Sequence, residues 1–445
     1  MERERTESPV RPLDPDTLPK IPKTGGARRG PPLNSRSFPP PVATAPVSVR
    51  PIEPTMHVVV LFRYFWPESR VSEEPHMLRE IVHRHVDRGD TVDVVCGASD
   101  DCRAAWAREF PERVRVHSFR APVDRNGPVS GRVLNSARLL VRGLGTLLTP
   151  GRIDLLYLFT YPPGFAGAMI ACCRVFRRRT RILFSFQDNL EYRIGNPLLR
   201  ALYRAYNRFC ISHATVTTVL SGEMREHLLA SVPLRSRGWI GERIEVVNNF
   251  YAEKVDPAGA AGAKTSDVIY AGNHGPGQNL AFFIEVVSRC RLQTAPRIVF
   301  YGGGTEKDAL MKFARQRGAP IEFRDPVDRH SIATEMQRAR YGLVAMLPDL
   351  PKYAFPSKII AYTCNGTKAL LMCDPAGDLA RWVAAEHLGA VLDVTDVDRA
   401  ARGLETLLAS VDDAAPHDTA SHAATLFGKD VFLARIEAIL GRLFP

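Results

Sequence analysis

With 445 residues, the chain is too long for one compact core, and this length favours two domains. Its 59 lysines and arginines outnumber its 48 aspartates and glutamates, and the formal net charge of +11 favours anionic partners such as nucleotides or anionic lipid surfaces. An arginine-rich surface without a specific partner would give the same excess, and charge carries no information about the fold.

The cysteines and the first residues of the chain indicate its compartment. No CxxC pair or Cys/His cluster has zinc spacing, so we expect free thiols in a reducing, cytoplasmic environment. The opening MERERTESPV is charged and lacks the apolar segment of a signal peptide. The longest apolar run, PPGFAGAMIACCRVF, is too short for a membrane-spanning helix.

Residues 1–55 are rich in Pro, Arg, Ser and Gly and show almost no periodic apolar pattern. Such a segment cannot bury enough apolar surface to offset its conformational entropy, so we expect a disordered tail. A docking role for this tail is the alternative to a passive extension.

Ordered structure is predicted to begin at residue 56, where MHVVVLFRYF is typical of a buried parallel strand. Helical spacing in EEPHMLREIVHRHVDRG places Met77, Ile81 and Val82 on one face, and DTVDVVCG is the next strand. This β-α-β pattern predicts a doubly wound α/β domain. Further strands are expected at 154–160, 181–186 and 214–220.

A helix is also predicted at 133–148, in the apolar stretch VLNSARLLVRGLGTLL, which contains Arg138 and Arg142. It is either a packed helix with solvated arginines or a basic surface that faces a membrane. The sequence leaves both interpretations open.

A second α/β alternation follows a linker that contains Gly, Ala and Pro. Strands are expected at 267–273, 297–304, 321–327, 341–347 and 368–374, with helices between them and a last helix near the end. We therefore predict two α/β domains, with the cleft between them as the expected site. The predicted boundaries are 1–55 for the tail, 56–250 for the first domain, 251–266 for the linker, 267–428 for the second domain and 429–445 for the C-terminal helix.

Several common motifs are absent. The first strand is followed by RYFWPESRVSEEP rather than GxGxxG, which argues against a dinucleotide-binding domain there. The chain has no GxxxxGK[ST] P-loop and no GxSxG elbow. The acidic pairs DPD and DVD do not follow central strands, so the sequence does not support a metal–diphosphate site, and we predict no metal.

Two glycine-rich turns each lie between a strand and a helix of the second domain. YAGNHGPGQNL contains Gly272, Gly275 and Gly277, and YGGGTEKDAL contains the run 302–304. Glycines at such turns allow backbone N–H groups to approach an anion beside a helix N-terminus. Each turn alone is more often a tight connection, but two in one domain favour a nucleotide diphosphate site.

Lys358 begins a predicted helix in YAFPSKIIAYTCNG, with no acidic neighbour in sequence. A cation is unfavourable against the positive N-terminal end of a helix dipole, unless an anion binds there. A solvated lysine is the alternative to a functional one.

The second domain resembles the donor domain of a family 4 retaining glycosyltransferase of the GT-B fold. The resemblance rests on VIYAGNHGPGQNL, IVFYGGGTEKDAL, IEFRDPVDRHSIATEMQRARYGLVAML, FPSKIIAYTCNGTKALL and GDLARWVAAEHLGAVLD. The first domain adds LFRYFWPE, RGDTVDVV and FQDNLEY, which look like the acceptor domain of the bacterial subgroup that builds polysaccharides, colanic acid and O-antigen. The resemblance covers roughly residues 56–440 and implies two Rossmann-like domains that face each other across a cleft.

The resemblance implies a set of site residues. Lys358 matches a basic residue that contacts the donor diphosphate, whose growing negative charge must be stabilised during transfer. The residues expected to be catalytic are Lys358, Asn273, His274 and Asp188. The donor-binding residues are Gly272, Gly275, Gln278, Gly302, Gly303, Gly304, Arg324, Val327, Phe355, Pro356 and Ser357. The acceptor-side residues are Tyr64, Trp66, Glu68, Arg70 and Gln187.

The sequence departs from the family pattern where many members carry two glutamates. Those positions here hold Tyr353 and Ala361, and the usual Arg and Lys after the first donor-domain strand are replaced near Asn273 and Gln278. Recognition of the donor-sugar hydroxyls is therefore the least certain part of the predicted site.

We expect a metal-independent, retaining glycosyltransferase that needs no cofactor and uses a nucleotide-sugar as donor substrate. Its acceptor would be a polysaccharide, a lipid-linked sugar or a small molecule. The enzyme would be located in the cytoplasm, with peripheral association at the inner face of a membrane. The alternatives are a catalytically degenerate GT-B scaffold and a nucleotide-sugar epimerase of the same fold. Nucleic-acid binding is disfavoured because the basic residues are dispersed. The donor base, sugar, acceptor and oligomeric state do not follow from the sequence.

Overall fold

In the computed structural model, the described residues are 55–64, 74–98, 100–110, 113–120, 129–160, 162, 164–252, 264–410 and 416–445. The predicted disordered tail lies outside these residues except for residue 55, and so does most of the predicted linker.

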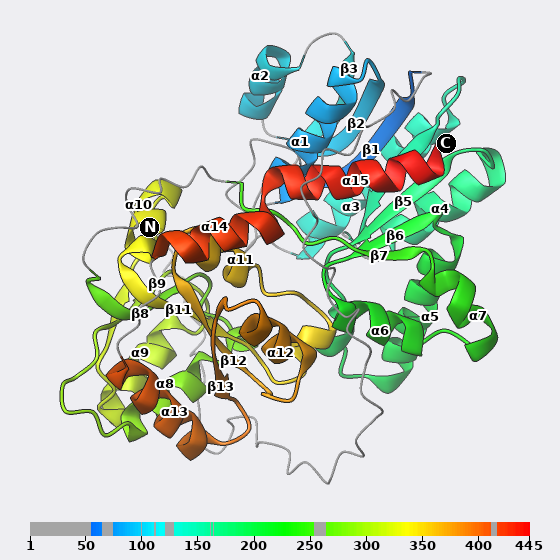
Figure 1. Cartoon of the computed structure of the whole chain (residues 1–445). Helices are drawn as coiled ribbons and strands as arrows, with labels where there is room; N and C mark the ends of the chain where they lie inside the picture. Colours follow the sequence, from blue (N-terminus) through cyan, green and yellow to red (C-terminus); the bar gives the residue numbers. More distant parts are fainter. Residues whose placement is uncertain are drawn as a thin grey trace, which may run out of the picture. The chain divides into compact units, whose positions relative to one another are not determined.

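The described chain divides into two compact units, each discontinuous in sequence (Figure 1). The N-terminal unit contains residues 55–252, 349–364 and 420–445, and the C-terminal unit contains residues 264–348 and 365–419. The continuous domain limits drawn from the sequence stay a prediction.

The N-terminal unit is built on a parallel sheet with the strand order β3-β2-β1-β4-β5-β6-β7. This order is that of a Rossmann-like doubly wound sheet, which confirms the predicted fold class for this unit. The strands are β1 (His57–Tyr64), β2 (Thr91–Ala98), β3 (Val114–Arg120), β4 (Leu155–Phe159), β5 (Arg181–Phe186), β6 (Val216–Val219) and β7 (Ile244–Val246).

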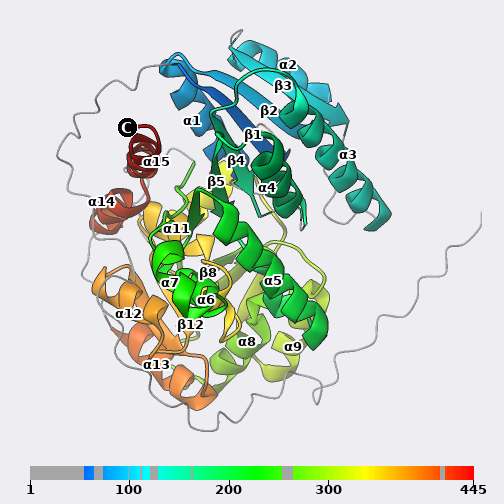
Figure 2. The ribbon, with the colours of Figure 1, turned by 90° about the vertical axis from the view of Figure 1, so that its right-hand side faces the viewer.

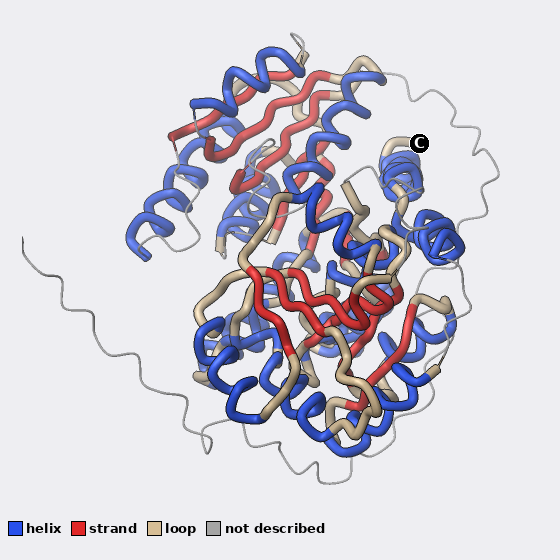
Figure 3. The backbone as a smooth tube through the Cα atoms, turned by 90° about the vertical axis from the view of Figure 1, so that its left-hand side faces the viewer, coloured by secondary structure: helices blue, strands red, loops and turns tan. Residues whose placement is uncertain are grey.

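Helices cover both faces of this sheet, as Figure 3 shows with blue helices around red strands. The helices are α1 (Glu74–Asp87), α2 (Asp100–Glu109), α3 (Val129–Leu148), α4 (Phe165–Phe176), α5 (Pro197–His213), α6 (Gly222–Ala230), α7 (Leu234–Gly241), α11 (Ser357–Cys364) and α15 (Lys429–Leu443), with short 3-10 turns η2 (Leu190–Arg193) and η5 (Leu350–Lys352). Helix α14 (Pro416–Phe427) contains residues of both units.

Alternation along β1 directs side chains to two separate cores, because successive residues of a strand point to opposite faces. Val58, Val60 and Phe62 join a buried cluster that includes residues of α1, α2 and α15. Leu61 points the other way, where a Cβ on Gly143 of α3 would lie 3.2 Å from it. Met77 of the predicted helical face is buried in the first cluster, as expected.

The sequence prediction missed β3. Its residues alternate between apolar Val114, Val116 and Phe119 and polar or charged side chains, and most of them are only half-buried. An edge strand of this kind lacks the continuous apolar run by which the buried strands were recognised.

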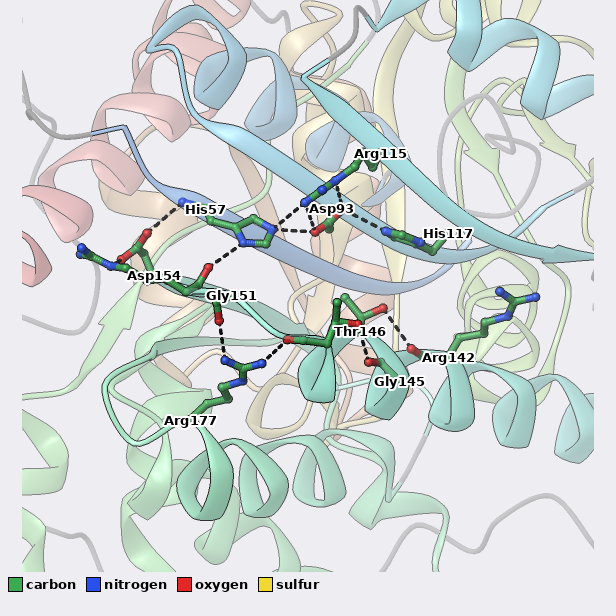
Figure 4. A network of polar contacts seen from close by, with 12 residues as sticks. His57, Asp93, Arg115, His117, Arg142, Gly145, Thr146, Gly151, Asp154 and Arg177 are labelled. Carbon is green, nitrogen blue, oxygen red and sulfur yellow. Dashed lines mark hydrogen bonds and ion pairs between the residues drawn. The ribbon is translucent and has the colours of Figure 1, made fainter.

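Buried Asp93 of β2 collects three basic side chains from neighbouring strands (Figure 4). It accepts hydrogen bonds from His57 Nε2 at 2.6 Å, His117 Nε2 at 2.9 Å, and Arg115 Nε and Nη2 at 2.8 Å each. Burial alone would raise the pKa of Asp93, but the contacts with His57, His117 and Arg115 outweigh it, so the pKa lies well below its usual value of 3.8.

We expect Asp93→Asn to lower the free energy of unfolding by about 2–4 kcal/mol at neutral pH, because it removes the charge that three basic side chains face and replaces one accepting oxygen by an NH2 group. A carboxyl with a depressed folded-state pKa stabilises the fold above its unfolded pKa, and this contribution is lost as pH falls. The difference between wild type and variant in urea unfolding should therefore shrink below about pH 4. A difference that is the same at pH 3 and pH 7 would contradict this role of the carboxylate.

The C-terminal unit contains a second parallel sheet, in the order β10-β9-β8-β11-β12-β13. It is again Rossmann-like and agrees with the predicted doubly wound architecture. Its elements are β8 (Ser266–Ala271), η4 (Pro276–Gln278), α8 (Leu280–Arg289), β9 (Ile298–Tyr301), α9 (Lys307–Arg317), β10 (Ile321–Arg324), α10 (Arg329–Gln337), β11 (Ala339–Ala345), β12 (Lys368–Cys373), α12 (Asp378–Ala385), β13 (Gly389–Asp393) and α13 (Val397–Ala409).

One buried cluster joins this sheet to its helices, with Tyr270, Phe300 and Phe283 among its largest members. The predicted strands and the helices between them are present with small shifts at their ends. Across the residues that the structure describes, no helix has both the length and the apolar character needed to cross a membrane.

Candidate functional site

The glycine-rich turns of the C-terminal unit lie at the carboxyl edge of its sheet. The turn after β8 and the turn after β9 follow adjacent parallel strands, so they are neighbours at this edge. The chain reverses its strand order between β8 and β11, and such a switch point is where open α/β sheets bind ligands. Asn279 spans this point: its Nδ2 donates to the carbonyl oxygen of Met346, beyond β11, at 3.4 Å.

Backbone hydrogen bonds join the two turns. Gly272 N–H donates to Tyr301 O at 3.0 Å, His274 N–H donates to Gly303 O at 2.8 Å, and Glu306 N–H donates to His274 O at 3.0 Å. These bonds hold the start of α9 against the turn after β8. The sequence analysis predicted both turns, but it did not predict that they pack against each other.

The close approach of the two turns explains why residues 302 and 304 are glycine. A Cβ on Gly302 would lie 1.9 Å from Gly272 O, and one on Gly304 would lie 2.4 Å from His274 O. Both glycines also have φ values, 139° and 150°, that other residues rarely adopt. Gly303 is different, since its Cβ would make only an ordinary contact of 3.7 Å with Pro326.

His274, predicted as a catalytic residue, has a fully buried side chain. Its ring packs among Tyr270, Phe300 and Phe323, with centroid distances of 5.5, 6.2 and 6.0 Å. This setting supports a role in shaping the turn through packing. Direct contact of the ring with a substrate stays a prediction, which the burial does not favour.

The other predicted residues of this turn are more accessible. Asn273 is exposed, and its carbonyl oxygen accepts a hydrogen bond from the Tyr270 hydroxyl at 2.6 Å. A Cβ on buried Gly275 would lie 2.6 Å from Asn273 Nδ2 and 3.2 Å from Gln278 Oε1. The two polar side chains therefore flank this glycine, and their predicted roles in the site stay predictions.

Arg324 ends β10 beside the second glycine-rich turn. Gly302 N–H donates to Arg324 O at 3.2 Å, while the guanidinium donates to Glu322 at 2.7 Å and to the hydroxyl of Tyr301. Tyr301 in turn donates to Glu335 at 3.0 Å. The contact with Glu322, followed by that with Tyr301, raises the pKa of Arg324, so it stays cationic. Val327 lies exposed in the loop after β10.

Lys307 and Glu306 at the start of α9 were missed by the sequence analysis. Lys307 Nζ donates to Arg324 O at 3.1 Å and to Asp325 at 2.6 Å, which ties α9 to the loop after β10. Burial raises the pKa of Glu306. Both residues lie just after the glycine run, in GGGTEK. This position beside a helix N-terminus was the feature from which the sequence analysis could have identified them.

The predicted residues of the N-terminal unit gather around the end of β5. Buried Gln187 receives a hydrogen bond from Asn249 Nδ2 at 2.9 Å and donates to Ser185 Oγ at 2.7 Å. Asp188 forms an antiparallel bridge with Ala354, and Asn189 N–H donates to Tyr353 O at 2.8 Å. The structure thus brings the polar pair 187–188 next to the segment that contains Lys358.

Asp188 has an exposed side chain, but the protein atoms packed around it partly desolvate its carboxyl group. This desolvation raises the pKa of its carboxyl, and Arg193 opposes the shift. A carboxyl with a raised pKa is a candidate for proton transfer. Its catalytic role stays a prediction.

Lys358 lies in the first turn of α11 and is half-buried. Desolvation lowers the pKa of its amine from 10.5 to about 8. Phe355, also predicted in the site, is buried and packs against Phe427, with ring centroids 6.3 Å apart, while Ser357 is exposed. Pro356 O accepts from the N–H of Ile359 at 3.0 Å and starts the turn that leads into α11.

A buried charged cluster that the sequence analysis did not identify supports this loop. Glu191 is almost fully buried and forms ion pairs with Arg204 at 2.6 Å and His227 at 3.1 Å. The ring of His227 meets the ring of Tyr353 edge to face at 4.7 Å. Desolvation would raise the pKa of Glu191, but Arg204 and His227 outweigh it and lower the pKa. Tyr353, one of the two positions at which the sequence departs from the expected glutamates, is here part of this packing.

We expect Glu191→Gln to destabilise the protein by about 1–3 kcal/mol, because Arg204 and His227 lose the charge that they face. Activity should fall further than stability explains, since Tyr353 and the loop before Lys358 lose their support. Thermal unfolding and turnover measured together test this. The control is Glu226→Gln, whose exposed pair with Arg225 should contribute less than about 1 kcal/mol. Equal effects of the two variants would argue against the supporting role.

The carboxyl end of β1 lies at the switch point of the N-terminal sheet, between β1 and β4. Tyr64 is the last residue of β1. Trp66, Glu68 and Arg70 lie outside the described residues. Their roles stay predictions.

No group of three or more His, Cys, Asp or Glu side chains suited to hold a metal ion occurs in the described parts of the chain. The expectation of a metal-independent reaction is not tested by this observation and stays a prediction.

Comparison with protein families gives a match over residues 76–240, to a model described as a glycosyl transferase 4-like domain. This range covers most of the N-terminal sheet and its helices. No curated protein matches the sequence.

Solved structures share the whole fold. A lipopolysaccharide outer core galactosyltransferase in its apo form matches with a TM-score of 0.59 at 11% identity, over 87% of this chain and 100% of the other. The catalytic domain of starch synthase IV from Arabidopsis thaliana, bound to ADP and acarbose, matches with a TM-score of 0.59 at 10% identity, over 88% of this chain and 99% of the other. A putative UDP-N-acetylglucosamine 2-epimerase from Listeria monocytogenes matches with a TM-score of 0.54 at 12% identity, over 87% of this chain and 96% of the other. These likenesses establish a GT-B fold.

Proposed function

We propose that this GT-B protein, whose residues 76–240 match a glycosyl transferase 4-like domain, transfers a sugar from a nucleotide-sugar to an acceptor, with retention of the anomeric configuration. The acceptor is a polysaccharide, a lipid-linked sugar or a small molecule, and the protein works at a membrane surface. No metal and no further cofactor take part in the proposed reaction.

The observation that carries this proposal is the pair of interlocked glycine turns at the switch point of the C-terminal sheet. Cβ atoms are excluded at Gly302 and Gly304 because they would meet carbonyl oxygens of the facing turn. The two turns therefore pack closely, and the surface of the protein at this edge lies beside the N-terminal ends of α8 and α9. Such a surface suits the diphosphate of a nucleotide-sugar. Starch synthase IV, which shares the fold, was solved with ADP bound.

Chemistry in this proposal comes from positioning and charge. A departing nucleoside diphosphate gains negative charge as the glycosidic bond to phosphate breaks, and Lys358 would stabilise it. A lysine with a pKa of about 8 is mainly protonated at neutral pH and carries the required charge. Desolvation strengthens its interaction with an anion.

Thermal shift with nucleoside diphosphates and nucleotide-sugars tests donor binding, and NMR of the product tests the anomeric outcome. We expect a UDP- or GDP-type ligand to raise the unfolding temperature and the product to keep the donor configuration. Absence of a shift with every nucleotide would favour the catalytically degenerate scaffold. An inverted product would overturn the proposal of retention.

An epimerase is the second candidate because a putative UDP-N-acetylglucosamine 2-epimerase shares the fold. The two functions differ in their need for an acceptor. Incubation with donor alone should leave a transferase donor unchanged apart from slow hydrolysis. Formation of a new nucleotide-sugar epimer without acceptor would identify an epimerase.

A further inference from the structure

The outward side of α3 is apolar, although water-facing sides of helices normally carry polar residues. Val133, Leu134, Val141 and Leu148 are all at least half exposed, and Val141 reaches 69%. At about 100° per residue, these four side chains fall within an arc of about 100°, and they extend over about 22 Å of helix. Leu139, on the opposite side, and Leu147, at the border of this arc, are buried, so the packing of the helix rests on side chains other than the four exposed ones.

The neighbouring helix extends this surface. Helices α3 and α4 pack side by side in the layer seen in Figure 2, and α5 follows α4. Arg177, directly after α4, donates to Leu147 O at 2.7 Å and to two further carbonyl oxygens in 149–151, which joins the C-terminal ends of α3 and α4 (Figure 4). Val175 and Phe176 lie exposed at that end of α4.

Arginines border the apolar residues, and acidic residues are almost absent. Arg138 and Arg142 occupy the edge of the α3 arc, and Arg178 and Arg179 follow α4, all with exposed side chains. Between residues 129 and 187 the sequence contains one acidic residue, Asp154, which is buried and paired with Arg152. The exposed side of these two helices is therefore apolar and cationic.

We propose that this surface, hereafter the α3–α4 face, binds an anionic lipid bilayer, with its apolar side chains inserted among the acyl chains and its arginines on the lipid phosphates. The combination suits the interface of a bilayer, which offers apolar chains beneath a layer of negative charge. The proposal names the surface by which the protein reaches a membrane, and it does not depend on the transferase activity.

The charge and the apolar character of this face favour a lipid surface over two other partners, a second copy of the chain and a nucleic acid. A symmetric contact between two copies would bring the arginines of both chains to one interface without acidic partners. A nucleic acid would leave the apolar side chains unmatched, because its binding rests on phosphate contacts and base stacking.

The test is cosedimentation of the full chain, without nucleotide, with vesicles of phosphatidylglycerol mixed with phosphatidylcholine, and with phosphatidylcholine alone. We expect binding to the anionic vesicles that weakens as salt rises from about 0.1 M. Leu134→Glu/Val141→Glu should lower the partition coefficient about tenfold or more. Arg138→Gln/Arg142→Gln should lower it to a similar extent on anionic vesicles only.

Matched controls separate the surface from general effects of charge. Leu234→Glu places the same change at an exposed leucine of α7, and Arg402→Gln removes an exposed arginine of α13. Both should bind within about twofold of wild type. Unfolding temperatures should be unchanged in all variants, since every substituted side chain is exposed.

Three results would overturn the proposal. The first is failure of the wild type to bind anionic vesicles, and the second is equal binding by wild type and Leu134→Glu/Val141→Glu. The third is a wild-type dimer, detected by light scattering, that this double variant dissociates, because the face would then be a contact between copies. Nucleotide-dependent thermal shift, measured separately, reports on the proposed function and is expected to be the same in wild type and variants.

Discussion

Lys358→Ala is expected to lower kcat by about 10²–10³, the effect of removing one group that stabilises developing negative charge in a desolvated site. Donor binding should weaken as well, since the same amine would face the diphosphate of the bound donor. Lys358→Arg should retain part of the activity because it keeps the charge. Steady-state kinetics and donor titration of the three proteins measure both effects.

The control for this prediction is Lys352→Ala, six residues earlier in the same loop. Lys352 is exposed and pairs with Asp349 at 2.7 Å, and its loss should change turnover by less than about twofold. Equal binding and turnover in wild type and Lys358→Ala would show that this lysine is only a solvated helix-start residue.

The lowered pKa of Lys358 gives the prediction a pH signature. In the free protein the amine loses its proton as pH rises through about 8, so kcat/KM should fall over that range. Stability changes in the opposite direction, because a lysine with a depressed folded-state pKa disfavours the folded state while protonated. This contribution is relieved as pH rises from about 8 to 10.5. Lys358→Ala should therefore be no less stable than wild type at neutral pH.

Gly302→Ala is expected to destabilise the C-terminal unit by about 3–5 kcal/mol and to abolish nucleotide-dependent stabilisation. The new Cβ would lie 1.9 Å from a backbone oxygen of the facing turn, and the backbone at φ 139° is unfavourable for alanine. The turns can relieve this clash only by moving apart, which would deform the proposed diphosphate surface. Thermal unfolding with and without nucleoside diphosphate measures both consequences.

Gly303→Ala is the matched control for stability. It adds the same methyl group to the next residue, where the nearest atom is 3.7 Å away. Its free energy of unfolding should lie within about 1 kcal/mol of wild type. If Gly302→Ala were as stable as Gly303→Ala and still bound nucleotide, the interlocked turns would not be the rigid surface that the proposal requires.

The sequence predicted the fold through its buried strands. Runs such as MHVVVLFRYF and RILFSF have no charge in the middle and fit strands covered on both faces, and they became β1 and β5. The half-exposed edge strand β3 lacks this signal and was missed. The second glycine-rich turn was also identifiable, because a strand followed by three glycines and a helix has few structural interpretations.

The contacts around Lys358 could not be predicted in the same way. Glu191, Arg204, His227 and Tyr353 lie far apart along the chain, and only the fold brings them into one cluster. The burial of His274 among aromatic rings likewise depends on β9 and β10, which supply Phe300 and Phe323. A local sequence pattern predicts contacts between residues that are near each other in the sequence. The contacts described here join elements that are far apart in it.

The position of α15 has a consequence for the order in which the protein folds during synthesis. Phe432, Ile436 and Leu440 complete the same buried cluster as Val58 and Met77, although the ribosome produces them near the end of the chain. Domains usually fold as they emerge, the N-terminal one first. Here the apolar side of α1 packs in one cluster with α15, which is translated much later, so we expect this side of the nascent N-terminal unit to stay uncovered until α15 has emerged.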